Sequence, residues 1–320
     1  MARPTPLIPP PCNDIPLGGG RSLRLGPQVG RGSMATVYRG VLDGSFGVAR
    51  TVAVKVFDVV ASDEHEGVLS ALASAARRSA SVRHPNVVRI EDFGLIGPAQ
   101  PYTVEELVEG SSLARFAARA ARHNERFPLD LALFVGAEIA EGLAAARLAC
   151  SPDGVRLGLV HGELSTCDVL LSWNGEVKVG DFGVSASARA ASSVRSTRSL
   201  ARRVRAMAPE VARGQPGDAR SDVFSLGVML REMMVGPRFP RIVSDAEALV
   251  WARDGVVHQS LFEPQLPQPL QGILTRAVER DPAHRFPHAG ALGYELRRVA
   301  LAMGVGDGRA FLRTALSRAL

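Results

Sequence analysis

Seven short motifs, widely separated along the chain, constrain its fold more than any other feature. The longest continuous run, residues 159–183, reads LVHGELSTCDVLLSWNGEVKVGDFG and contains His161, several acidic side chains and an Asp-Phe-Gly triplet. The other motifs are, in chain order, Gly30-Arg31-Gly32, Lys55, Ala208-Pro209-Glu210, Asp222 and Arg285. So many separated motifs do not occur by chance in one fixed order and at fixed spacings. Together they limit the chain to a narrow set of folds.

The composition is that of a protein with a sizeable apolar core. The 320 residues are 46% hydrophobic, which suits one two-lobed domain or two ordinary ones. No apolar run reaches the roughly 18 residues that a membrane span needs. The three cysteines, Cys12, Cys150 and Cys167, are far apart and odd in number. We therefore expect a reduced, cytoplasmic protein without disulfides, a cysteine-based zinc site or contact with a membrane.

The chain is expected to divide into a β-rich part followed by an α-rich part. Short β-type runs separated by turn residues are expected over residues 23–30, 36–42, 51–59, 87–95 and 101–107. One helix, capped by Ser62, should interrupt them and end near Ser81, because Pro85 disfavours helical backbone just before it. Apolar periodicity predicts further helices over residues 129–149, 222–234, 270–280, 288–303 and 309–320.

This pattern predicts an α+β protein with two lobes and a cleft between them. The Pro- and Gly-rich residues 1–21 are expected to form a disordered leader, because they cannot bury a core. Residues 22–109 should form the smaller lobe, residues 110–303 the larger lobe, and residues 304–320 a helical tail. The tail would either cap the larger lobe or bind a partner.

The positive charge of the chain is almost entirely arginine. The formal net charge is +6, yet the only lysines are Lys55 and Lys178. A coding bias that places arginine on solvated faces explains this most simply, and a nucleic-acid surface is the alternative. Aromatic residues make up only 5% of the chain and do not alternate with the arginines. Nucleic acid is therefore not the expected partner.

The seven motifs together resemble those of protein kinases, in particular bacterial serine/threonine kinases of the Hanks type. The resemblance covers roughly residues 23–300. It implies a two-lobed kinase fold, with a small lobe of sheet and one helix and a large, mainly helical lobe. It also implies that Glu210 pairs with Arg285 inside the large lobe and that Asp222 anchors the backbone of the catalytic loop.

The resemblance further implies a site for ATP. Gly30 and Gly32 would let the backbone approach the phosphates, and Lys55 would hold the α and β phosphates. The residues expected at the nucleotide are Gly30, Gly32, Val37, Ala53, Lys55, Glu105, Glu106, Val108 and Leu170. The apolar members would enclose adenine, while the Glu106 carbonyl and the Val108 amide would hydrogen-bond to it. The same positions also suit ordinary core and backbone, which stays an alternative.

Several catalytic positions depart from the family. Glu163 stands where kinases have the catalytic aspartate; it is one methylene longer, and a misplacement of about 1 Å costs roughly 100-fold in rate. Ser165 replaces the lysine that neutralises the transferring phosphate, so a positive charge is lost. Asp168 replaces the metal-binding asparagine, and together with Asp181 it remains a candidate ligand for Mg²⁺, which prefers oxygen.

The helix glutamate that pairs with the lysine in this family is also missing. Family spacing, nine residues before His84, falls on Ala75. Glu66 would face the opposite side of the helix, and Glu64 would lie about 16 Å along its axis. Neither is expected to replace the missing carboxylate.

Glu105 is a candidate substitute for that missing carboxylate. It falls at the position before the hinge that is normally apolar or threonine, where a lone carboxylate is costly to bury unless it is paired. The hypothesis is that Glu105 pairs with Lys55 and competes with nucleotide for it. The alternative is a shift in strand register that leaves Glu105 at the surface.

These departures favour a pseudokinase that binds ATP weakly and regulates or scaffolds partner proteins, such as an active kinase or another signalling protein. The alternative is a slow serine/threonine kinase that uses Glu163 as base, Lys55 for phosphates, and Asp168 and Asp181 for Mg²⁺. A third, less favoured reading is an arginine-rich nucleic-acid binder. The segment 181–210, with arginines at 189, 195, 198, 202, 203 and 205, is expected to be a solvated loop, a dock for an acidic partner or a phosphorylation site.

Overall fold

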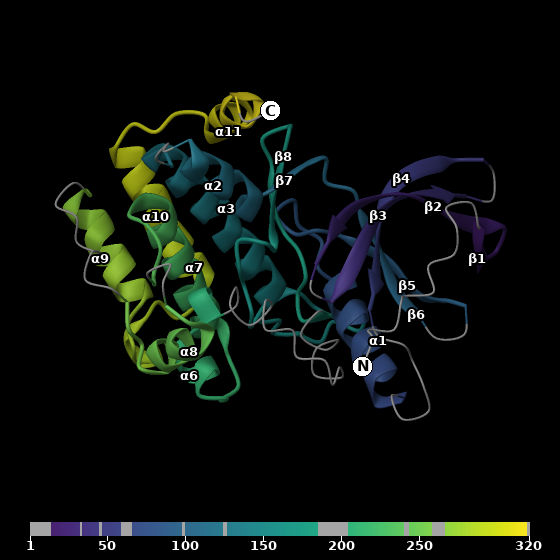
Figure 1. Ribbon diagram of the computed structural model, residues 1–320, viewed down its shortest axis with the longest axis horizontal. Coiled ribbons are helices and arrows are strands. Elements are labelled where there is room, and N and C mark those ends of the chain that lie inside the picture. The colour runs from purple at the N-terminus through teal and green to yellow at the C-terminus, as the bar shows by residue number, and fades with distance from the viewer. Residues whose placement is uncertain are drawn as a thin grey trace. The chain divides into compact units, whose positions relative to one another are not determined.

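The computed structural model describes residues 14–32, 34–44, 47–58, 66–97, 100–123, 127–184, 204–239, 243–257 and 266–318 (Figure 1). They form two compact units. The sheet-rich unit comprises the described residues as far as Ser81, together with Arg89–Val108 and Val184. The helical unit comprises Val82–Val88, Glu109–Gly183 and the described residues from Val204 to Arg318. The expected α+β division into a β-rich and an α-rich part is confirmed.

The sheet-rich unit is built on one antiparallel sheet. Its strands are β1 (Asp14–Gly18), β2 (Arg21–Arg31), β3 (Ala35–Asp43), β4 (Ala49–Phe57), β5 (Ile90–Ile96) and β6 (Gln100–Glu106), in the spatial order β1-β2-β3-β4-β6-β5. Side chains alternate between the two faces of a strand. Val52, Val54 and Val56 of β4 accordingly join one apolar cluster, so Ala53 and Lys55 point to the opposite face.

Part of the expected leader is ordered. Residues 1–13 lie outside the described residues, but Asp14–Gly18 form β1, which pairs with β2. The prediction of a disordered leader is therefore wrong for residues 14–21. Pro16 argues against a strand, because proline is unfavourable inside a sheet. An edge strand tolerates proline, and β1 lies at the edge of the sheet.

One helix, α1 (Glu66–Ala80), packs in the sheet-rich unit. Its Leu72 is fully buried and belongs to a cluster with Phe57 at the end of β4 and Ile90 of β5. The predicted helix over residues 62–81 is thus present from Glu66 onward, and its expected cap, Ser62, lies outside the described residues.

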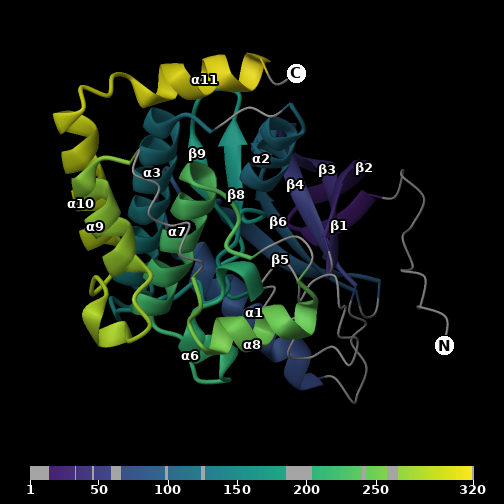
Figure 2. The ribbon, with the colours of Figure 1, turned by 60° about the vertical axis from the view of Figure 1, so that its left-hand side comes forward.

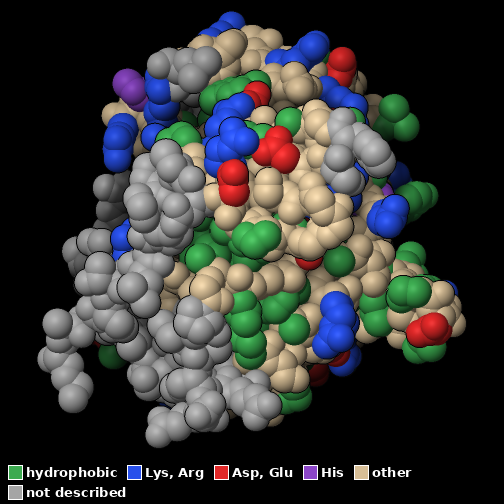
Figure 3. Space-filling view, turned by 90° about the vertical axis from the view of Figure 1, so that its right-hand side faces the viewer, with side chains coloured by type: hydrophobic (Ala, Val, Ile, Leu, Met, Phe, Trp, Pro, Cys, Tyr) green, Lys and Arg blue, Asp and Glu red, His purple; other side chains and the backbone are tan. Residues whose placement is uncertain are grey.

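Ion pairs cross the surface of this unit. Arg24 donates to Asp14 at 3.3 Å and to Asp43 at 3.0 Å, which links three neighbouring strands. On the face drawn in Figure 3, Lys or Arg side chains lie beside Asp or Glu side chains, in keeping with such pairs. Each exposed pair of this kind contributes about 0–1 kcal/mol to stability, so these pairs do not determine the fold.

The helical unit is centred on one long buried helix. Its helices are α2 (Leu113–Arg122), α3 (Leu129–Leu148), α6 (Pro209–Ala212), α7 (Ala219–Met234), α8 (Asp245–Arg253), α9 (Gln268–Ala277), α10 (Ala289–Ala302) and α11 (Gly308–Arg318), with a 3₁₀ turn at Pro282–His284. The three-stranded sheet β7 (Gly110–Ser112), β8 (Val169–Ser172) and β9 (Val177–Val179) completes it. Figure 2 shows α7 and α10 beside α3, whose Leu131, Leu133 and Ile139 are fully buried.

The C-terminal helix belongs to this core. Leu312 and Leu316 of α11 are buried in the same apolar cluster as α3. Of the two roles expected for the tail, capping of the large lobe is therefore the one its packing supports. Within the described part of the chain, no helix combines the length and apolar character needed to cross a membrane.

Candidate active site

The register of the sheet-rich unit gathers several expected nucleotide-site residues on one face. Lys55 is paired with Val37 on one side and with Thr103 on the other. Ala53, two residues before Lys55, shares its face and is paired with Glu105. The Lys55 Nζ lies 5.5 Å from the centre of the Phe57 ring. Arg39, paired with Ala53, also lies on this face, which therefore carries two cations, Arg39 and Lys55, and the Glu105 carboxylate.

Glu105 is held on the Lys55 side of the sheet. The Thr103 hydroxyl donates to Glu105 Oε1 at 2.7 Å, and Thr103 is fully buried. Lys55 is directly opposite Thr103, so Glu105 is its diagonal neighbour, and long side chains at such positions reach one another. The register does not leave Glu105 at the surface on the other face, which was the alternative arrangement.

The residues expected to bond adenine follow immediately. Strand β6 ends at Glu106, and Val108 comes two residues later. The Glu106 amide donates to the Arg89 carbonyl at 2.9 Å, and the Glu106 side chain accepts from the Arg89 amide at 2.8 Å. These two hydrogen bonds fix the backbone at the end of β6, just before Val108.

The glycines of the first motif lie at the turn between β2 and β3. Gly30 is paired with Val37, and the Gly32 amide donates to the Ala35 carbonyl at 2.8 Å. A Cβ added at Gly30 would approach Val37 only to 3.9 Å, and one at Gly32 would approach the Ala35 oxygen only to 3.4 Å. Neighbouring protein atoms thus do not demand glycine here. Without side chains at Gly30 and Gly32, a ligand could approach the backbone of this turn closely.

The face of α1 that packs on the sheet has no carboxylate. Ala75 is packed against the cluster that contains Leu72, and Ser79 is almost fully buried. The only acidic residue in α1 is Glu66, at its first position. Ala75 thus lies on the inward side of the helix, as the spacing predicts, and supplies no charge to Lys55.

In the helical unit, Asp222 fixes the start of the catalytic loop. Its Oδ2 accepts from the His161 amide at 2.9 Å and its Oδ1 from the Gly162 amide at 2.8 Å. A capping box between Asp218 and Ser221 starts α7 and so sets the place of Asp222 in its first turn. Burial raises the pKa of Asp222, and the two amides and His161 oppose that rise.

The Asp-Phe-Gly triplet packs against the same loop. His161 Nε2 is 2.9 Å from the Gly180 carbonyl oxygen, and its ring lies 5.0 Å from the ring of Phe182, which is buried. Asp181 adopts a φ of 72°, which is uncommon for a residue other than glycine. The backbone therefore turns sharply at Asp181 while the next side chain enters the core.

Ser165 and Asp168 form a tight local hydrogen-bonded turn. Asp168 Oδ2 accepts from the Ser165 hydroxyl at 2.7 Å and from the Ser165 amide at 2.9 Å. The Gly180 amide donates to the Asp168 carbonyl at 2.8 Å, so Asp168 lies beside the segment that carries Asp181. Leu170 lies on β8 and is paired with Lys178 of β9. Glu163, the residue at the catalytic position, is half-buried and precedes the buried Leu164.

The side chains of Asp168 and Asp181 have the oxygen chemistry that a phosphate-bound Mg²⁺ ion prefers. Such an ion takes one or two protein carboxylates and completes its shell with phosphate oxygens and water. Asp168 and Asp181, on hydrogen-bonded segments, are the two candidates. No cluster of three or more His, Cys, Asp or Glu side chains suited to a metal occurs among the described residues.

Glu210 and Arg285 form a buried ion pair, as the resemblance implies. Both terminal guanidinium nitrogens of Arg285 bond the two carboxylate oxygens at 2.8 Å, and the Ser221 hydroxyl donates to Glu210 at 2.7 Å. Thr103 and Ser221 are the supporting residues that the sequence analysis missed. The sequence could have indicated Thr103, because it lies two residues before Glu105 on the same strand and therefore on the same face.

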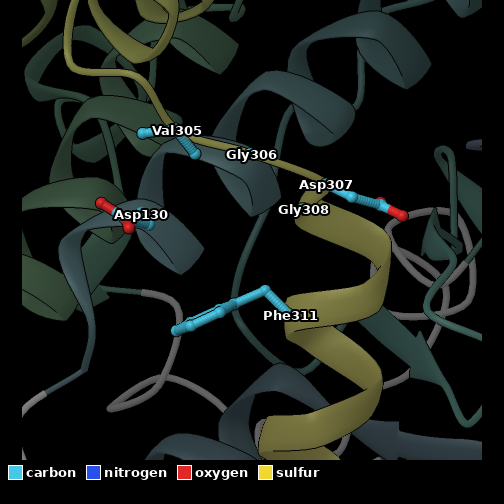
Figure 4. A pocket seen from close by; sticks show the side chains of 6 residues that line it. All are labelled: Asp130, Val305, Gly306, Asp307, Gly308 and Phe311. Atoms are coloured by element: carbon cyan, nitrogen blue, oxygen red, sulfur yellow. The ribbon is translucent and has the colours of Figure 1, made fainter.

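A small hollow in the helical unit is unrelated to these residues. It has a volume of about 90 Å³ and is lined by Asp130, Val305, Gly306, Asp307, Gly308 and Phe311 (Figure 4). Sites for drug-sized ligands and cofactors occupy about 300–1,000 Å³. None of the expected site residues lines this hollow.

Comparison with known proteins decides the family. The model of the family described as protein tyrosine and serine/threonine kinase matches residues 23–292. The chain belongs to the protein kinase family. This kinase domain is of the Hanks type, and it has the two-lobed kinase fold that the motif order predicts.

Curated relatives and solved structures agree. The domain is 31% identical over 267 residues to the tyrosine-protein kinase MasK of Myxococcus xanthus, covering 82% of this chain and 41% of MasK. It is 31% identical to the serine/threonine-protein kinase PknL of Mycobacterium bovis, covering 85% of this chain and 64% of PknL. The crystal structure of the Mycobacterium tuberculosis PknI kinase domain matches with a TM-score of 0.61 at 21% identity, over 88% of this chain and 96% of that one.

The matched relatives are longer than this chain. It spans only 39–41% of the length of the first three curated relatives. The family as a whole uses ATP and Mg²⁺ to phosphorylate proteins. Of the six arginines in segment 181–210, the five at positions 189–203 lie outside the described residues. Arg205 is described, and it donates to the Phe239 carbonyl at 3.4 Å.

Proposed function

We propose that this kinase domain is a pseudokinase: it binds ATP weakly and acts in the cytoplasm by binding partner proteins such as an active kinase or another signalling protein. The observation that carries the proposal is the turn at Ser165 and Asp168. In the family a lysine at the Ser165 position brings a positive charge to the transferring phosphate. Here a neutral hydroxyl occupies the position, and it donates to the Asp168 carboxylate.

The charge balance at the reacting phosphate is therefore unfavourable. Phosphoryl transfer is catalysed mainly by cations and dipoles placed where negative charge develops. The Ser165 position carries no cation, and one oxygen of the Asp168 carboxylate is used for two hydrogen bonds within the loop. Removal of one such transition-state contact costs about 3 kcal/mol, so losing the lysine and the α1 glutamate together would slow transfer about 10⁴-fold.

Weak ATP binding follows from the face that carries Lys55. The Thr103 hydroxyl anchors Glu105 at a diagonal neighbour of Lys55. A carboxylate at this place attracts the ammonium group and repels phosphate. Nucleotide must then displace Glu105 from the neighbourhood of Lys55 before its phosphates are held.

Replacing Glu105 with methionine is accordingly expected to tighten ATP binding by about 10-fold, equivalent to about 1.4 kcal/mol. Glu105→Gln, which keeps the shape and removes the charge, should act in the same direction. Isothermal titration with ATP measures the effect. Asp43→Asn, which removes a carboxylate at the far end of β3, is the matched control and should leave affinity unchanged. Equal affinities of Glu105→Met and the parent domain would show that Glu105 does not restrain Lys55.

A second candidate, a slow serine/threonine kinase, is favoured by the order of the catalytic loop. Asp222 holds two successive amides of the loop, and Phe182 is packed against His161. Glu163 is still a carboxylate, and Asp168 and Asp181 still offer oxygens to Mg²⁺. In this account Glu163 accepts the proton of the substrate hydroxyl, and the remaining groups place the phosphates.

Two measurements on the same samples separate the candidates. Thermal stability is measured with ATP, with and without Mg²⁺, and transfer of the γ-phosphate to protein is followed by radiolabel. Stabilisation without transfer supports the pseudokinase. Transfer that is lost in Glu163→Ala supports the slow kinase instead, and an unchanged melting temperature contradicts nucleotide binding in either form.

A further inference from the structure

The outer face of α2 is made of arginine and alanine. Leu113 and Phe116 point into the core, whereas Arg115 and Arg122 are exposed and Arg119 is half-buried. Spacings of four and three residues place the three guanidinium groups within about 60° of one another around the helix. The residues between them on this face are alanines, so the arginines are the only large groups that project from it.

Helix stability does not account for this composition. Arg119 and Arg122 lie in the last turn, where a cation interacts favourably with the helix dipole. Arg115 lies in the first turn, where a cation is unfavourable and an acidic residue is preferred, yet α2 has no acidic residue there. Only Arg115 is unfavourably placed, so interaction with the helix dipole does not explain why arginine occupies this position.

The three arginines also differ from the arginines of α10. On α10, Arg297 lies 3.2 Å from Glu138 and Arg298 lies 3.2 Å from Glu295. By contrast, no ion pair joins Arg115, Arg119 or Arg122 to a carboxylate of the described residues. The α2 face thus presents positive charge that the described part of the chain leaves uncompensated.

The chemistry of this face points to an acidic protein segment. Arginine forms two parallel hydrogen bonds to a carboxylate, which fixes direction as well as charge. In an extended peptide, alternate side chains lie about 6.8 Å apart, close to the rise of about 6 Å from Arg115 to Arg119. A single strand of nucleic acid would need exposed aromatic rings for its bases, and a membrane would need large apolar side chains to insert. The exposed residues of α2 offer neither.

We propose that the outer face of α2, formed by Arg115, Arg119 and Arg122, is a docking site for an acidic, extended segment of a partner protein. The proposal rests on the proposed function in one respect, because it names the kind of partner that such a binding protein would hold. It does not depend on whether the domain binds ATP.

The site lies next to the catalytic loop. The amide of Ala114, in the first turn of α2, donates to the Thr166 carbonyl at 2.9 Å, and Ser112 caps the helix while pairing with Leu170 of β8. Figure 2 shows α2 beside β8 within the helical unit. A backbone hydrogen bond therefore joins the helix that carries the docking site directly to the loop that carries Ser165 and Asp168.

The test uses fluorescence anisotropy with a labelled twelve-residue peptide of alternating Glu and Ser. A peptide in which Gln replaces Glu is the neutral probe, and a twelve-nucleotide single-stranded RNA and anionic vesicles are competitors. The variant is Arg115→Gln/Arg119→Gln/Arg122→Gln. Its matched control is Arg309→Gln/Arg313→Gln/Arg318→Gln on α11, which removes the same charge from another exposed helix of the same unit.

We expect the Glu peptide to bind at least 10-fold more tightly than the Gln peptide. The α2 variant should weaken it at least 10-fold, and the α11 control less than twofold. Equal losses in both variants would mean attraction by net charge alone and would overturn the proposal. RNA or vesicles that bind more tightly than the peptide and depend on α2 would overturn it in favour of another partner. ATP titration of the α2 variant, expected to match the parent domain, keeps this result separate from the nucleotide proposal.

Discussion

Replacing Arg285 with methionine is expected to lower the free energy of unfolding of the helical unit by about 3–5 kcal/mol, because it leaves a buried carboxylate without its partner. The Arg285 side chain is fully buried and that of Glu210 is 9% exposed. Arg285 also donates to the carbonyl groups of Glu279, Arg220 and Arg280, and its guanidinium lies 4.8 Å from the centre of the Phe224 ring. One substitution therefore removes contacts to three segments of the unit: Glu210, helix α7 and residues 279–280.

The ion pair also predicts a pH dependence. Burial raises the pKa of Glu210, but the hydrogen bonds from Arg285 and Ser221 outweigh it and leave the pKa below its ordinary value. A carboxyl whose pKa is lowered on folding stabilises the protein above its unfolded pKa, about 4.3, and that contribution is lost as the pH falls through the lowered value. The stability difference between the parent domain and Arg285→Met should therefore shrink in acid.

Urea unfolding followed by tryptophan fluorescence measures both effects, because Trp173 and Trp251 lie in the helical unit. Arg298→Met is the matched control. Arg298 is exposed and pairs with Glu295 one turn away, so its loss should cost less than about 1 kcal/mol. Equal losses for the two variants, or a difference that does not change between neutral and acid pH, would contradict the role given to the buried pair.

Replacing Asp222 with leucine is expected to cost about 3–5 kcal/mol and to release the catalytic loop. The change leaves the buried amide of His161 and the half-buried amide of Gly162 without an acceptor, and each unmade bond of this kind costs about 1–3 kcal/mol. Asp222→Asn, which keeps one acceptor oxygen, should have a smaller effect. Amide hydrogen exchange at residues 161 and 162 should be at least 10-fold faster in Asp222→Leu.

Asp254→Leu is the control for this substitution, since Asp254 is an exposed residue at the end of α8. It should leave exchange at residues 161 and 162 unchanged. Unaltered exchange in Asp222→Leu as well would show that other contacts hold the loop, such as the packing of Phe182 on His161.

Hydrophobic pattern predicted the larger elements and missed the small ones. Helix α3 was predicted over residues 129–149 and spans Leu129–Leu148, because its apolar residues are dense enough to give a clear period. Helix α2 was missed because LARFAARAAR has only two large apolar residues, both near its start. Strand β1 was missed because a Pro- and Gly-rich stretch becomes ordered only through its pairing with β2.

Motif spacing proposes the residues of the candidate site, among them Glu163, Asp168 and Asp181, but does not specify their hydrogen bonds. That the Asp168 carboxylate accepts two bonds from Ser165 depends on the backbone turn, which no pattern of residue types specifies. The neighbourhood of Lys55 and Glu105 depends on strand register, because a shift of one residue would reverse the face on which Glu105 lies.

The most direct test of the central claim is transfer of radiolabel from γ-labelled ATP, with Mg²⁺ present, by the parent domain and by Glu163→Ala. The pseudokinase account predicts that label in both stays at the level of a blank without protein, while ATP still raises the melting temperature of both. Label above that level in the parent domain that disappears in Glu163→Ala would contradict the account and identify Glu163 as the base of a working kinase.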